Sequence, residues 1–163
     1  MIGFSVEFIE SFVKSSPKEY GCANIFFKLN NEIGVKATLK DYIRDENYEM
    51  QSLASDHNLG PLVYGKIDFE YQDLTWYGYF TEVVETITKD DLAKLNTSER
   101  ADLVVKLDLL RVELKEVIDF DFSDNHCGNI GYKKGKMVCI DFDSEDTLFF
   151  ENLCIHDIML GDK

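Results

Sequence analysis

The chain has 163 residues, the length of one domain or two small lobes, and its 45% apolar and 13% aromatic residues suffice for a hydrophobic core. This composition excludes a disordered chain, and no apolar run is long enough to span a bilayer. The net charge is −14 and basic segments are absent, so neither direct nucleic-acid binding nor a membrane partner is expected. The segment MIGFSVEFIESF does not resemble a signal peptide, which makes a cytoplasmic location the expectation.

The N-terminal part of the sequence predicts a helix followed by a hairpin. Phenylalanines at helical spacing predict a short amphipathic helix that ends before Pro17. The segments 24–29 and 33–38 are rich in strand-forming residues, and Asn30 and Asn31 between them favour a tight turn. Together the two segments predict a β-hairpin.

The next segment predicts a helix and two further strands. A helix is expected over 46–57, and Gly60 and Pro61 end it. Strands are expected over 62–67 and 75–84. The first half of the chain therefore predicts a small sheet with one helix.

The second half begins with a long predicted helix. Asn96 is a suitable N-cap, and Glu99 follows at capping-box spacing. One apolar stripe at helical spacing predicts the buried face of this helix: Leu103, Leu107, Leu110, Leu114 and Val117. After an acidic loop, Gly135 marks a turn before an apolar strand over 137–142.

The stretch DFSDNHCGNIGYKKGKMVCIDFD, residues 121–143, gathers oxygen ligands around this strand. Asp124 and Asn129 are separated by four residues, and Asp141 stands at the end of the strand, which would return it to the loop. Magnesium binds one or two carboxylates together with phosphate oxygens, and phosphoryl transfer needs a carboxylate that orients the acceptor hydroxyl. The pattern therefore predicts one orienting carboxylate (Asp124) and two metal ligands (Asn129 and Asp141).

This pattern resembles the catalytic loop and metal-binding motif of the protein kinase-like superfamily. The sequence from Asp124 to Asn129 is similar to the D-x-H-x-x-N loop of aminoglycoside and choline kinase relatives and of atypical kinases. Asp141-Phe142-Asp143 stands where those kinases have D-F-G. The resemblance implies ATP and Mg²⁺ as cofactors, with Asp124 orienting the acceptor hydroxyl.

The first half resembles the same template. Gly34-Val35-Lys36-Ala37 is similar to V-A-I-K, so the resemblance implies that Lys36 holds the α- and β-phosphates. It also implies a helical glutamate that orients this lysine, which is Glu49, with Glu46 as the alternative.

The resemblance implies an adenine site as well. The segment 77–85 resembles the fifth strand and hinge, so Glu82 and Val84 are expected to meet the adenine through their backbone. Gly21 and Ala23 are expected to contact the nucleotide from what remains of a glycine-rich loop.

Two features depart from the template. Asp143 replaces the glycine of D-F-G, and the chain continues for only 20 residues beyond it. We therefore expect an α+β, minimal kinase-like fold in one domain (1–163). A small antiparallel N-lobe sheet with one αC-type helix (1–86) would precede a truncated helical C-lobe (87–163), with the break between Val84 and Asp91.

The expected function is that of an ATP- and magnesium-dependent phosphotransferase whose acceptor the sequence does not reveal. The first alternative is a pseudokinase-like module that binds a protein partner or a second copy. Its small size would suit a phage or mobile-element effector acting on a host protein in the host cytoplasm. The second alternative is an acidic mimic of nucleic acid, which the charge of −14 allows.

Overall fold

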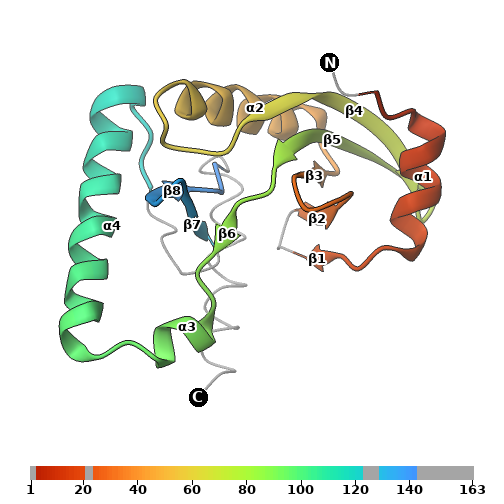
Figure 1. The fold of residues 1–163 in the computed structure, drawn as a ribbon. Helices are drawn as coiled ribbons and strands as arrows, with labels where there is room; N and C mark the ends of the chain where they lie inside the picture. The colour runs from red at the N-terminus through yellow and green to blue at the C-terminus, as the bar shows by residue number, and fades with distance from the viewer. Residues whose placement is uncertain (1–2, 21–23, 123–128, 143–163) are drawn as a thin grey trace. The chain divides into compact units, whose positions relative to one another are not determined.

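The structure is a computed structural model that describes residues 3–20, 24–122 and 129–142 (Figure 1). It has a mixed α+β fold, as predicted, with helices and two antiparallel sheets of five and three strands. The elements in chain order are α1 (Val6–Ser15), β1 (Glu19–Tyr20), β2 (Asn24–Lys28), β3 (Ile33–Thr38), α2 (Asp41–Asp56), β4 (Val63–Tyr71), β5 (Leu74–Glu82), β6 (Glu85–Thr86), α3 (Lys89–Ala93), α4 (Thr97–Ile118), β7 (Ile130–Lys133) and β8 (Lys136–Cys139).

The chain divides into two compact units. The described part of the first unit comprises residues 3–20, 24–48 and 63–83, and that of the second comprises 49–62, 84–122 and 129–142. One boundary falls between Val83 and Val84, between β5 and β6 and just before the segment where the sequence predicts a break. The other boundaries enclose residues 49–62, which include the second half of α2, so the second unit begins earlier in the chain than expected.

The first unit is built on the five-stranded sheet, whose strand order is β1-β2-β3-β5-β4. The predicted hairpin is present as β2 and β3. The Asn30 side chain closes its turn by accepting hydrogen bonds from the backbone N–H groups of Glu32 and Ile33, at 2.7 and 2.8 Å. Strands β4 and β5 form a second hairpin, turned by Gln72 and Asp73, both in the left-handed region.

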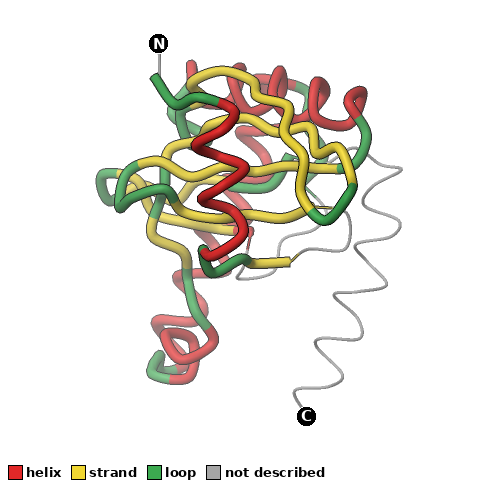
Figure 2. Tube along the Cα trace, turned by 90° about the vertical axis from the view of Figure 1, so that its right-hand side faces the viewer, coloured by secondary structure: helices red, strands yellow, loops and turns green. Residues whose placement is uncertain are grey.

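Helix α1 covers the sheet of the first unit, and the core between them is apolar and rich in aromatic residues (Figure 2). Ile9 and Val13 of α1 are fully buried against it. Phe27 of β2 and Phe69 of β4 meet edge to face, with ring centroids 6.0 Å apart. The predicted N-terminal helix is thus confirmed, and α1 ends just before Ser16 and Pro17.

The second unit packs α4 against the short sheet β6-β7-β8. The capping prediction is confirmed, because Asn96 Oδ1 accepts a hydrogen bond from the Glu99 N–H at 2.8 Å. The predicted stripe is confirmed except at its last position. Ile118 rather than Val117 continues the buried line of Leu114, and Val117 is 46% exposed.

Several element boundaries differ from the prediction. Helix α2 begins at Asp41, five residues earlier than predicted, and β8 ends at Cys139 rather than at Phe142. The two-residue strands β1 and β6 were not predicted, because a strand of that length has no periodicity of its own. Within the described residues, no helix is long and apolar enough to cross a membrane.

Candidate functional site

The β7–β8 hairpin brings the two predicted metal ligands together. Lys134 and Gly135 form its turn in the left-handed region, with φ angles of 51° and 78°. At the open end of the hairpin, the Ile140 N–H donates to the Asn129 carbonyl at 3.0 Å. Asp141 is the next residue, so the ladder holds the backbones of Asn129 and Asp141 next to each other. This neighbourhood was predicted from the apolar strand that precedes Asp141.

The chain around this pair is fixed by packing within the second unit. Asn129 is 7% exposed and Asp141 is half-buried. The Cys139 N–H donates to the Leu59 carbonyl at 3.0 Å, which ties β8 to the chain after α2. The ring of Phe142 is buried beside Phe120, with centroids 5.2 Å apart. The chain is thereby held in place on both sides of Asp141, at Cys139 and at Phe142.

Gly60 is required for this packing. A Cβ atom at Gly60 would lie 2.9 Å from the Phe142 ring, closer than real side chains approach. The sequence singled out Gly60 as a helix stop. The structure adds that Gly60 leaves room for the residue that follows Asp141.

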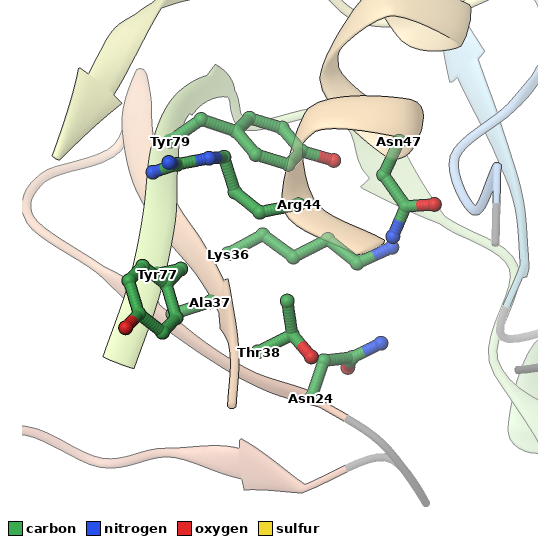
Figure 3. A pocket seen from close by; sticks show the side chains of 8 residues that line it. All are labelled: Asn24, Lys36, Ala37, Thr38, Arg44, Asn47, Tyr77 and Tyr79. Carbon is green, nitrogen blue, oxygen red and sulfur yellow. The ribbon is translucent and has the colours of Figure 1, made fainter. Parts of the chain in front are cut away.

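Lys36 lies on β3, the third strand in chain order, and it is 9% exposed. It lines a small pocket in the first unit, together with residues of β2, β5 and α2. Figure 3 shows the lysine side chain extending toward Asn47 of α2, with Thr38 and Asn24 beside it. Asn24 and Thr38 are paired across the β2–β3 ladder. A cation is thus held inside a polar pocket instead of on a solvated strand edge.

The polar residue that α2 directs at Lys36 is Asn47, which is 2% exposed. Glu49, predicted to orient this lysine, has an exposed side chain, and so has the alternative Glu46. A carboxylate in water is a poor partner for a buried ammonium group, so its exposure counts against the predicted role of Glu49. Helical periodicity could have indicated Asn47, because it follows the buried Ile43 by one turn.

Arg44 ties α2 to the strands behind Lys36. Its Nη1 donates to Asp68 Oδ1 at 2.8 Å and to the Gly78 carbonyl at 3.2 Å, and its Nε donates to Asp45 at 2.7 Å. Burial alone would lower the pKa of Arg44, but the hydrogen bonds to Asp68 and Asp45 raise it overall. The hydrogen bonds that Asp45 accepts from Lys66 and Arg44 lower the pKa of its carboxyl. Sequence reasoning did not find this network.

The predicted adenine-contacting residues lie at the end of β5 and just after it. Glu82 is the last residue of β5, paired with Ile33, and the Val83 N–H donates to the Glu32 carbonyl at 2.8 Å. Val84 is half-buried and begins the longer of the two segments of the second unit. Their contact with adenine stays a prediction.

Three predicted site residues, Gly21, Ala23 and Asp124, lie outside the described residues. In the part of the chain that is described, no group of three or more His, Cys, Asp or Glu side chains could hold a metal ion. The predicted metal ligands are instead one amide and one carboxylate, which suits a magnesium ion whose other ligands are phosphate oxygens and waters.

Comparison of the sequence with protein-family models gave no match, and a search among curated proteins found no similar sequence. The fold and the geometry of the site therefore carry the functional argument.

Proposed function

We propose that this chain is an ATP- and magnesium-dependent phosphotransferase of the protein kinase-like type, acting on a hydroxyl acceptor. The observation that carries the proposal is the β7–β8 hairpin, whose open end brings the backbones of Asn129 and Asp141 close together, with Ile140 bonded to Asn129 and Asp141 next in the chain. An amide oxygen and a carboxylate on neighbouring backbone positions are suitable ligands for a magnesium ion bound to nucleotide phosphates.

The position of Lys36 supports the same proposal. The kinase-like resemblance requires a lysine on the third strand, and Lys36 lies on β3 of a sheet with α2 between β3 and β4. The order of the later elements, a long helix and then a hairpin that ends at Asp141, is also the order that the resemblance implies. A lysine in a polar pocket is suited to binding phosphate oxygens.

In this proposal Lys36 binds the α- and β-phosphates, and Asn129 and Asp141 hold the metal ion. When bound, Mg²⁺ neutralises charge on the transferred phosphoryl group. Asp124 orients the acceptor hydroxyl and accepts its proton. Most of the rate enhancement would then come from positioning and charge neutralisation, since phosphoryl transfer needs little covalent chemistry from the protein.

A pseudokinase-like binding module is the second candidate, and one observation favours it. The residue that α2 directs at Lys36 is an amide, Asn47, whereas the kinase-like template needs a carboxylate to orient the lysine. An amide can accept a hydrogen bond from the ammonium group, but it is neutral and cannot take the place of that carboxylate. This version of the fold would bind nucleotide, or hold its shape without it, and would not turn it over.

Thermal unfolding with and without ATP and MgCl₂ tests the first proposal. Ligand at a hundred times its dissociation constant stabilises a protein by about 2.7 kcal/mol, a shift of roughly 5–10 °C for a chain of this size. We expect this shift in the wild type and its loss in Asp141→Asn and Lys36→Met. The matched control is Asp73→Asn, the same chemical change at an exposed turn, which should keep the full shift.

Turnover separates the two candidates. ADP release that depends on Asp141 supports the phosphotransferase, whereas a magnesium-dependent shift without ADP release in the presence of varied hydroxyl acceptors favours the binding module. A wild type whose unfolding temperature does not respond to ATP and MgCl₂ contradicts the proposed nucleotide site altogether.

A further inference from the structure

Helix α4 has two apolar faces. Its inner face packs in the core of the second unit through Leu110, Leu114 and Ile118. Its outer face carries a second line at spacings of four, four and three residues, which we call the outer stripe: Ala101, Val105, Leu109 and Val112. The three larger members are 58%, 59% and 51% exposed. At 100° per residue, the outer stripe lies opposite the inner face.

The charges beside the outer stripe alternate in sign along each of its edges. Lys106 and Glu113 lie on one edge, and Asp108 and Arg111 lie on the other. Glu113 forms an ion pair with Lys136 at 3.4 Å, and Asp108 forms one with Arg111 at 3.6 Å. All four side chains are at least 45% exposed. These ion pairs are open to water and can be shared with a partner at little cost.

We propose that the outer stripe of α4 binds the outer stripe of a second copy of this chain, with the two helices antiparallel. A two-fold axis perpendicular to both helices and close to Leu109 places equal edges of the two helices together. Lys106 then faces Glu113 of the second copy, because the two residues lie three and four positions from Leu109 on opposite sides.

The other edge is complementary in the same arrangement. Asp108 lies one position before Leu109 and Arg111 lies two positions after it. Asp108 of each copy therefore faces Arg111 of the other copy. A parallel pair, whose two-fold axis runs along the helices, would bring opposite edges together and would offset Lys106 from Asp108 of the second copy, and Glu113 from Arg111, by two residues along the helix. The antiparallel dimer places the opposite charges at the same height on both edges, so charge matching favours it.

A groove next to the stripe enlarges the surface available to the second copy. It has a volume of about 210 Å³ and lies between α4 and the β7–β8 hairpin, lined by Leu109, Leu110, Tyr132 and Met137 among others. Asp102 and Glu116 place like charges near the two ends of the stripe, which limits the contact to its central turns. Because such a contact is smaller than the roughly 1,000 Å² of a stable interface, we expect a weak, concentration-dependent dimer.

Sedimentation velocity of the full-length chain over a hundredfold concentration range tests the proposal. The wild type should associate as the concentration rises, and Leu109→Glu should raise the dissociation constant at least tenfold. Val117→Glu is the matched control, because Val117 is 46% exposed on the same helix but lies off the stripe. It should leave association unchanged.

Charge reversal tests the antiparallel geometry directly. Lys106→Glu alone and Glu113→Lys alone each create two like-charge pairs in the homodimer and should weaken it. An equimolar mixture of the two variants restores both pairs as opposite charges, so it should associate more tightly than either variant alone. This test does not depend on the proposed nucleotide site.

A wild type that stays monomeric at every concentration would overturn the proposal. The outer stripe would then be covered by another part of the chain or by another protein. A mixture that associates no better than its components would overturn the antiparallel pairing.

Discussion

The two units of the chain use their apolar residues differently. The sheet of the first unit packs against α1 over a core rich in aromatic residues, and its functional candidate, Lys36, is a buried cation on β3 of the same sheet. The second unit holds its candidates at the open end of a hairpin of two four-residue strands, and leaves a line of apolar residues on α4 more than half exposed. Polar side chains are usually exposed and large apolar ones usually buried, so both units depart from the usual distribution of residues between core and surface. Each departure marks a place where the fold is suited to bind a ligand or a partner.

The largest expected effect is in the core of the first unit. Phe27 is 1% exposed and contacts two other aromatic rings, so Phe27→Ala should lower the free energy of unfolding by about 3–5 kcal/mol. Urea unfolding followed by tryptophan fluorescence measures this, because Trp76, the single tryptophan, belongs to the same core. A loss below 1 kcal/mol would mean that this core is loosely packed.

The two faces of α4 give the next contrast. Leu114 is fully buried, so Leu114→Ala should cost about 2–5 kcal/mol, whereas Leu109→Ala on the outer face should change stability by less than about 0.5 kcal/mol. Chemical denaturation at low protein concentration, monitored by circular dichroism, compares the pair on the same helix. Equal losses would show that the outer face is covered in solution even in the monomer.

A smaller loss is expected at the start of α4. Asn96→Ala removes the oxygen that accepts from the Glu99 N–H, and we expect a cost of about 1 kcal/mol. Asn96→Asp is the control, because aspartate is an equally good N-cap and should retain the stability. The denaturation midpoint of each variant measures the difference, and equal losses in both would contradict a capping role.

The smallest effect concerns pH and the Arg44 network. Ion pairing to Lys66 and Arg44 lowers the folded-state pKa of Asp45, so its contribution is present above its unfolded pKa of about 4 and is lost as the pH falls through the lower folded value. Asp45 is 45% exposed, which limits this contribution to at most about 1 kcal/mol.

Asp45→Asn should therefore destabilise the protein at pH 7 and have a smaller effect at pH 3. Asp73→Asn, at an exposed turn, serves as the control for the loss of one negative charge. A destabilisation by Asp45→Asn of the same size at both pH values would assign the role of Asp45 to packing.

Much of this arrangement could be predicted from local sequence. Asn30 and Asn31 predicted the first hairpin, Asn96 and Glu99 the start of α4, and Gly135 the turn before β8. The neighbourhood of Asn129 and Asp141 was also predictable, because a hairpin with a short turn brings its two ends together whatever surrounds it.

The tertiary structure alone decided which polar residues are buried. Glu49 and Asn47 are two positions apart on one helix, so they point in different directions. Only the packing of α2 determines that Asn47 is directed at Lys36 while Glu49 is exposed. The same holds for Arg44, whose partners Asp68 and Gly78 are distant in sequence. Local propensities act over a few residues, whereas burial depends on which elements meet, and that is decided by the whole fold.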